Sequence, residues 1–106
     1  IWILYDKEES TFIGRGGLRH TVVEKKDEIE LAYAFLPSQW GKGLATELSF
    51  ALLKIAEDLG FSDVTSCATP TNAASIRVME KAGFIYERDF IYEDEGACVL
   101  YRKKLK

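Results

Sequence analysis

The 106-residue sequence has little cysteine and histidine, and these scarcities exclude two classes of small protein. The two cysteines, Cys67 and Cys98, lie far apart in the sequence, and His20 is the single histidine. Neither the closely spaced ligand pairs of a zinc site nor the cysteine framework of a disulfide-rich domain is present. We therefore expect two reduced, largely buried thiols and no bound metal.

Long apolar runs and an excess of positive charge are also missing. No run approaches the roughly 18 apolar residues of a membrane-spanning helix, and no signal sequence is recognisable. Lysine and arginine total 14 against 17 acidic residues, a net charge of −3, which argues against binding to a phosphate backbone. We expect a cytoplasmic protein that binds neither nucleic acid nor membranes. Because the chain starts at Ile1 within a β-rich run, we also expect the natural protein to have a preceding segment, which could hold a signal.

The order of the hydrophobic patterns predicts one domain over residues 1–106. A chain of this length buries roughly 60 to 70 % of its unfolded surface, which is enough for a core without disulfides. Charged turns are expected at 6–10, 24–28 and 93–96. The patterns predict strands over 1–5, 11–23, 29–36, 64–68, 84–92 and 97–104, and helices over 44–59 and 73–82.

The long helix is expected to bury a single apolar stripe. Gly60 should end this helix as a left-handed cap, and Gly83 should end the second helix. Three glycines at 14, 16 and 17 interrupt a strand, where they favour a bulge or a close backbone approach over a phosphate loop. The predicted stripe consists of Leu44, Leu48, Ala51, Leu52, Ile55 and Leu59.

A Gly-Lys-Gly turn, Gly41 to Gly43, separates the strand at 29–36 from the long helix. Glycine lets a backbone approach a ligand closely, and the first amides of a helix have no partner within the helix. Such a turn can bind an anion such as phosphate. The strand–helix–strand unit around it crosses over right-handed, which puts the turn at the carboxyl ends of parallel strands, where ligands bind.

Two motifs together resemble one family. The run Trp40–Glu47 and the run Asn72–Phe84 are similar to the GCN5-related N-acetyltransferase (GNAT) family, and most similar to its RimJ/RimL-like branch of ribosomal-protein N-terminal acetyltransferases. The resemblance implies an α/β (α+β) fold: a mixed, mostly antiparallel twisted sheet with a central parallel β-α-β acyl-CoA-binding unit. It covers the chain from Ile1, which matches the family's second strand, so the first strand and first two helices of the family have no counterpart.

The resemblance implies acetyl-CoA as co-substrate and no metal. The backbone of Phe35 and Leu36 would pair with the pantetheine arm, and Asn72, which is also the expected cap of the second helix, would contact that arm. Lys42 either adds a point charge or is simply solvated. Trp40 stands where the family consensus has Gln or Arg. The expected pyrophosphate-binding amides are those of Gly41, Lys42, Gly43, Leu44 and Ala45.

The resemblance also suggests catalytic roles for two residues. Ser75 matches a position proposed to protonate the departing CoA thiolate; without the resemblance it reads as an ordinary first-turn residue. Glu30 either accepts the proton of the attacking amine or is a solvent-exposed carboxylate at the edge of the sheet. Tyr33 matches a recurrent family tyrosine, with core packing as the favoured role, and His20 reads as a surface or packing residue.

The implied reaction is direct transfer of an acetyl group to a primary amine, without a covalent enzyme intermediate. The acceptor stays open between a peptide N-terminus and a small amine. Family members often dimerise, and the sequence leaves this undecided. The alternative is a non-catalytic acyl-CoA-binding module or a degenerate subunit, which the presence of Glu30 and Ser75 disfavours. A nucleotide-binding protein would need glycine patterns that the sequence lacks.

Overall fold

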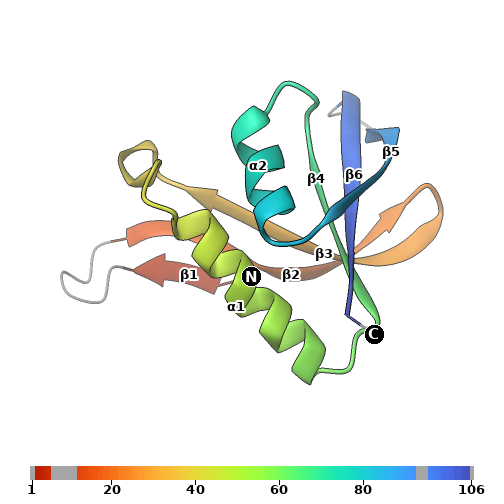
Figure 1. The fold of residues 1–106 in the computed structure, drawn as a ribbon, viewed down its shortest axis with the longest axis horizontal. Coiled ribbons are helices and arrows are strands. Elements are labelled where there is room, and N and C mark those ends of the chain that lie inside the picture. The colour runs from red at the N-terminus through yellow and green to blue at the C-terminus, as the bar shows by residue number, and fades with distance from the viewer. Residues whose placement is uncertain (1, 6–11, 93–95, 106) are drawn as a thin grey trace.

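The computed structural model describes residues 2–5, 12–92 and 96–105, and these form one sheet with helices packed on it (Figure 1). The order of elements predicted from the sequence is present throughout these residues. The strands are β1 (Trp2–Tyr5), β2 (Phe12–Val23), β3 (Lys26–Phe35), β4 (Asp63–Ala68), β5 (Ile85–Tyr92) and β6 (Gly96–Lys104); the helices are η1 (Pro37–Gln39), α1 (Leu44–Asp58) and α2 (Ala73–Lys81).

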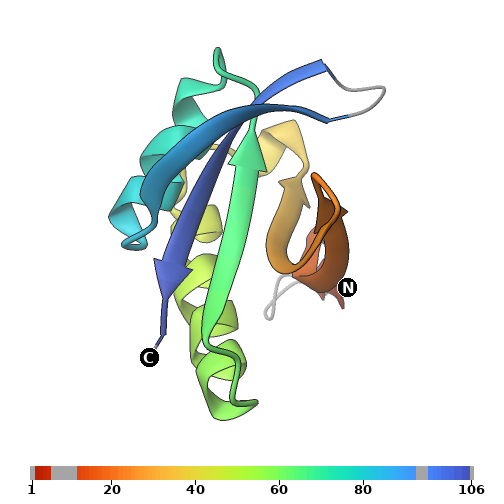
Figure 2. The ribbon, with the colours of Figure 1, turned by 90° about the vertical axis from the view of Figure 1, so that its right-hand side faces the viewer.

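The six strands lie in the order β1-β2-β3-β4-β6-β5. Every neighbouring pair is antiparallel except β3 and β4, which are parallel and are connected through α1. The expected mixed, mostly antiparallel sheet with a central β-α-β unit is therefore confirmed. Both α-helices lie on the same side of β4 and β6 (Figure 2).

The hairpin between β2 and β3 is tighter than the charged turn predicted over 24–28. Val23 pairs with Lys26, so that only Glu24 and Lys25 form the turn, and β3 begins three residues before the expected Ile29. Both turn residues have positive φ, 48° and 69°, as a two-residue turn that follows the sheet twist requires. Glycine and asparagine, the residues that usually indicate such a turn, are absent at Glu24 and Lys25, so the sequence does not predict it.

Helix α1 buries only part of the predicted stripe: Leu52 is buried and Leu48 packs against the core, but the buried face is centred to one side of the prediction. Its buried residues are Ser49, Leu52, Leu53 and Ala56, whereas Ala51 and Ile55 of the predicted stripe are exposed. The helix carries apolar residues on two neighbouring sides, and the twisted sheet beneath it decides which side is covered. Local spacing alone could not make that choice.

Both helices end at the predicted left-handed glycines, Gly60 and Gly83. After α1, Phe61 donates its backbone N–H to the Ala56 carbonyl; after α2, Phe84 donates to the Met79 carbonyl. These are Schellman caps, which satisfy carbonyls that the helix leaves without partners. Phe84 packs beside Met79 in the core, as the sequence predicted.

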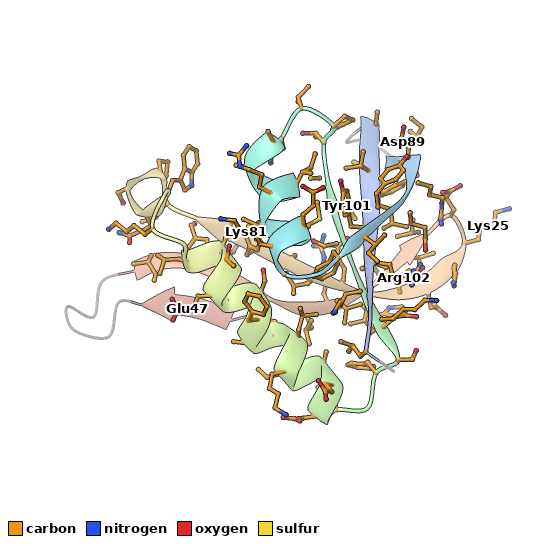
Figure 3. All side chains as sticks on the ribbon, in the orientation of Figure 1. Lys25, Glu47, Lys81, Asp89, Tyr101 and Arg102 are labelled. Atoms are coloured by element: carbon orange, nitrogen blue, oxygen red, sulfur yellow. The ribbon has the colours of Figure 1, made fainter. Side chains whose placement is uncertain are left out.

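Hydrophobic residues pack on both faces of the sheet. The larger cluster fills the space between the helices and the sheet, and the smaller one lies on the opposite face, built from Val23, Phe90, Cys98 and Leu100. Successive residues of β6 serve the two faces: Tyr101 belongs to the larger cluster, and Arg102 projects toward the β2–β3 hairpin (Figure 3).

Arg102 ties four parts of the sheet together. Its guanidinium bonds both carboxylate oxygens of buried Glu28 on β3, at 2.8 and 3.0 Å, and also contacts Asp63 on β4 and Glu87 on β5. The hydrogen bonds and charge of Glu28 and Glu87 raise the pKa of Arg102. This network links β6 to β3, β4 and β5 through side chains.

Two of the three strand glycines allow close packing, as predicted. A Cβ atom at Gly14 would lie 2.4 Å from the Ala34 carbonyl oxygen, and one at Gly16 would lie 2.6 Å from a methyl of Leu48 on α1. Helix α1 can therefore approach β2 closely, which positions its first turn above the end of β3.

Two predicted turns, 6–10 and 93–96, fall outside the described residues, apart from Gly96. Within the described residues, no helix is long and apolar enough to cross a membrane.

Candidate active site

Strands β3 and β4 are paired at one position only, Glu30 opposite Thr65. On either side of Glu30, two side-chain hydroxyls of β4 add hydrogen bonds to β3. Thr65 donates to the Ile29 carbonyl at 3.2 Å and Ser66 to the Leu31 carbonyl at 3.0 Å. Beyond Leu31 the strands run in different directions (Figure 1). The sheet is therefore split at the carboxyl ends of its two parallel strands.

A cavity of about 150 Å³ lies in this split. Both residues proposed as catalytic line this cavity: Glu30 comes from β3 and Ser75 from α2. Its polar groups come from both faces of the sheet, because alternate residues of a strand point to opposite sides. Glu30 and Cys67 come from the face opposite the helices, and Tyr33 and Ser75 from the helical face.

Glu30 is buried, with only 4 % of the residue exposed. The alternative interpretation from the sequence, a solvent-exposed carboxylate at the edge of the sheet, is therefore wrong. Arg19, which faces it across the hairpin, donates its Nε–H to Oε1 at 2.8 Å and pairs with the same oxygen through Nη2. The Cys67 thiol donates to Oε2 at 3.1 Å. Both carboxylate oxygens are thus held in place, one by a full positive charge and one by a weak donor.

Cys67 is a protonated thiol in this arrangement. Burial raises its pKa well above that of a free cysteine, and the negative charge and hydrogen bond of Glu30 raise it further. Within the described residues neither Cys67 nor Cys98 forms a disulfide, as expected from the sequence. A thiol of this kind is a poor nucleophile, so Cys67 acts here as a hydrogen-bond donor to Glu30.

Tyr33 and Ser75 both line the cavity on its helical side. Burial raises the pKa of the Tyr33 phenol, and a hydrogen bond with the Ser75 side chain opposes part of that increase. The Ser75 backbone N–H donates to Oδ1 of Asn72 at 3.1 Å, so Asn72 is the predicted cap of α2. The cap fixes the first turn of α2 and hence the position of Ser75.

The glycine turn before α1 has the geometry of an anion site. Gly41 and Gly43 have φ of 78° and 76°, and a Cβ at either would meet no atom within 4 Å, so these glycines are required by conformation and open toward solvent. Gly43 caps α1 without any side-chain hydrogen bond, which leaves the first-turn amides pointing outward. Lys42 bonds Gln39 at 3.3 Å.

The end of β3 presents backbone groups to the split. The Leu36 N–H donates to the Ile13 carbonyl on the β2 side at 3.0 Å. Gly14 and Phe35 are therefore a non-hydrogen-bonded pair, and the N–H and C=O of Phe35 point to the other edge, where β4 has already diverged. Phe35 thus faces the split with its backbone, whereas Leu36 uses its N–H within the sheet.

Sequence reasoning missed three contributors to the cavity. Arg19 had no assigned role, Cys67 was expected to be an ordinary buried thiol, and Tyr33 was expected mainly to pack the core. The pairing of Arg19 with Glu30 follows from the hairpin register, so the two-residue turn would have revealed it. His20 is exposed and bonds Asp27 at 3.1 Å, in line with its surface reading.

No group of three or more His, Cys, Asp or Glu side chains able to hold a metal is found across 2–5, 12–92 and 96–105.

Residues 1–85 match the model of the acetyltransferase (GNAT) domain. The chain belongs to this family. A curated relative, the uncharacterized protein YkkB of Bacillus subtilis (strain 168), is 32 % identical over 97 % of this chain and 60 % of its own length. The chain thus spans less than two thirds of this relative.

Solved GNAT structures share the fold. A putative GNAT-family acetyltransferase from Bordetella pertussis superimposes with a TM-score of 0.84 at 25 % identity, covering 95 % of this chain and 63 % of the other. The aminoglycoside acetyltransferase AAC(6')-Ib, solved in complex with coenzyme A and kanamycin, matches with a TM-score of 0.74 at 24 % identity, covering 91 % and 62 %. Membership of this family makes acyl transfer from acetyl-CoA the activity to test.

Proposed function

We propose that this domain transfers the acetyl group of acetyl-CoA to a primary amine by direct attack. The observation that carries the proposal is the cavity at the split, where Glu30 and Ser75 meet from opposite faces of the sheet. Acetyl-CoA supplies the acetyl group as a thioester, whose carbonyl carbon bonds to the amine nitrogen as the C–S bond breaks. The protein must then take one proton from the amine and supply one to the departing sulfur.

Glu30 is the proposed proton acceptor. Among the described residues, its Oε2 accepts a hydrogen bond from the Cys67 thiol, a weak donor that an amine can replace, whereas its Oε1 stays with Arg19. An amine in the cavity would therefore meet a carboxylate that is already oriented. Fixed groups of this kind lower the barrier because they need no reorganisation during the reaction.

Ser75 is the proposed donor to the departing thiolate. Ser75 lines the cavity together with Tyr33, and its side chain lowers the pKa of that phenol in part. The pKa of Tyr33 is raised, which keeps its phenol protonated as a partner behind Ser75. The two hydroxyls form a short chain that can stabilise the thiolate and deliver a proton to it.

We propose that the cofactor lies along the open end of β3 and the start of α1. The amides of Gly41, Lys42, Gly43, Leu44 and Ala45 would hold the pyrophosphate, helped by the positive end of the α1 dipole. Phe35 would pair with the pantetheine arm in the manner of an added strand, with Leu36 and Asn72 beside it. The outward direction of Phe35 and the absence of a side-chain cap on α1 support this arrangement.

For the acceptor we propose two classes of primary amine. The motifs resemble the RimJ/RimL-like branch, which favours a peptide N-terminus. The structural similarity to AAC(6')-Ib, which was solved with kanamycin, favours a small amine such as an aminoglycoside. Two thiols that form no disulfide in the described residues accord with a reducing compartment, and we propose that the protein is cytoplasmic.

Calorimetric titration with acetyl-CoA tests the cofactor site, with ATP as the control ligand. Gly43→Glu should abolish acetyl-CoA binding, because it places a carboxylate among the amides that would hold the pyrophosphate. Gly60→Glu is the matched control: Gly60 also has positive φ, 88°, and open space around it, but lies at the other end of α1.

Both variants carry a left-handed non-glycine residue, at a cost of about 1–2 kcal/mol in stability. Only Gly43→Glu should lose binding. Equal affinity in the two variants would refute the assignment of the loop. Saturable binding of acetyl-CoA without turnover on any amine of a panel of N-terminal alanine peptides, kanamycin and spermidine would favour the acyl-CoA-binding module instead.

A further inference from the structure

Trp40 makes a contact that the proposed function leaves unexplained. Its indole Nε1 donates to the Phe35 carbonyl oxygen at 3.0 Å. As derived above, this carbonyl points to the open edge of β3. One of the outward backbone acceptors at the end of the strand is therefore already bonded by a side chain of the same loop.

Packing does not explain the position of the indole. Trp40 is 69 % exposed and belongs to neither hydrophobic cluster of the described residues. The short helix η1 turns the chain back after Phe35. The backbone N–H of Trp40 ends this helix by donating to the Pro37 carbonyl at 3.1 Å. This turn brings the indole beside the strand end that it caps.

We propose that Trp40 is a displaceable cap on the open edge of β3, which competes with the pantetheine arm for the Phe35 carbonyl. This inference rests on the proposed function. An arm that adds to the edge like a strand places its amide N–H on that carbonyl, in the plane of the sheet. The indole ring occupies this place, and its high exposure means that it can swing outward without opening the core.

The cap protects a sheet edge in the absence of ligand. Unpaired strand edges attract other strands, and proteins cover them with loops or side chains. The same contact lowers the affinity for acetyl-CoA, because binding must break one hydrogen bond before making its own. The inference therefore links Trp40 to the pantetheine part of the cofactor and separates it from the pyrophosphate loop that follows.

Trp40→Phe tests the cap, since phenylalanine keeps an aromatic ring and removes the N–H donor. We expect Trp40→Phe to bind acetyl-CoA about two- to tenfold more tightly, the range that corresponds to one exposed hydrogen bond. Adenosine 3′,5′-bisphosphate, which lacks the pantetheine arm, should bind wild type and Trp40→Phe equally. Calorimetry of both ligands with both proteins gives the comparison.

Fluorescence reports the movement itself. In a Trp2→Phe background Trp40 is the only tryptophan, and its emission should change on addition of acetyl-CoA but not of adenosine 3′,5′-bisphosphate. Unchanged or weaker acetyl-CoA binding by Trp40→Phe would overturn the cap and make Trp40 an anchor of the loop. Absence of acetyl-CoA binding to both wild type and Trp40→Phe would instead overturn the proposed function, and the cap with it.

Discussion

We expect Arg19 to hold the side chain of Glu30, the proposed proton acceptor, in position and to stabilise its buried negative charge. The perturbation is Arg19→Met, which removes the guanidinium and keeps an unbranched side chain. In the wild type, Arg19 supplies two contacts to Oε1 of Glu30, and the Glu30 side chain is 5 % exposed. The variant leaves that buried carboxylate with the Cys67 thiol as its remaining hydrogen-bond donor among the contacts described above.

The structure sets the size of the effect. Removing one partner of a buried ion pair costs about 3–5 kcal/mol, because the other charge is left without compensation. The Arg19 side chain is 47 % exposed, so water can enter where the guanidinium was and recover part of this loss. We therefore expect a loss of about 2–3 kcal/mol in the free energy of unfolding, below the range for a fully buried pair.

Urea denaturation of four variants measures this loss. Arg88→Met is the matched control, because Arg88 pairs with Glu24 at 2.9 Å and Glu87 at 2.8 Å, and these carboxylates are 54 % and 33 % exposed against 5 % for Glu30. Ion pairs that water can reach contribute about 0–1 kcal/mol. Glu30→Gln should cost less than Arg19→Met, since it leaves a half-exposed cation that water can solvate. The double variant Arg19→Met/Glu30→Gln should be more stable than Arg19→Met alone. A loss in Arg19→Met no greater than that in Arg88→Met would refute the reasoning.

Two further predictions concern the chemistry of the cavity. Ser75→Ala should leave acetyl-CoA affinity near that of wild type and slow turnover at least tenfold, about 1.4 kcal/mol in the barrier; steady-state kinetics with Tyr33→Phe as the companion variant measures it, and wild-type turnover would remove Ser75 from the mechanism. Because burial and Glu30 raise the pKa of Cys67, alkylation of this thiol by iodoacetamide should be slow at neutral pH and accelerate only at more alkaline pH than for a free cysteine. Glu30→Gln should increase the rate in a Cys98→Ser background, and an unchanged rate would contradict the contact between Glu30 and Cys67.

The parts of this fold that the sequence predicts well are those with local causes. Asn72, Gly60 and Gly83 act on their own helix ends, through one hydrogen bond or one left-handed residue, and the structure confirms all three. The same holds for the order of strands and helices, since hydrophobic periodicity reflects each element separately. No tertiary contact is needed to infer them.

The features that the sequence does not predict depend on contacts between elements. The buried face of α1 is chosen by the sheet, because the helix is apolar on two sides. The pairing of Arg19 with Glu30 needs the hairpin register, which two non-glycine residues at positive φ determine. The split itself depends on a single parallel pair, Glu30 with Thr65, and no local pattern marks the point at which two distant strands stop pairing.

The position of that last pair explains how the two halves of the proposed site can meet. Glu30 and Tyr33 are three residues apart on β3, so they belong to opposite faces, which a continuous sheet would keep separate. Because β3 and β4 pair at Glu30 and diverge after the Ser66–Leu31 contact, the cavity reaches both sides, with Cys67 and Arg19 on one and Ser75 on the other. An amine can then approach the carboxylate from the face opposite the helices while a thioester lies against the helical face. The register of one strand pair thus determines whether the proposed proton acceptor, Glu30, and the proposed proton donor, Ser75, line the same cavity.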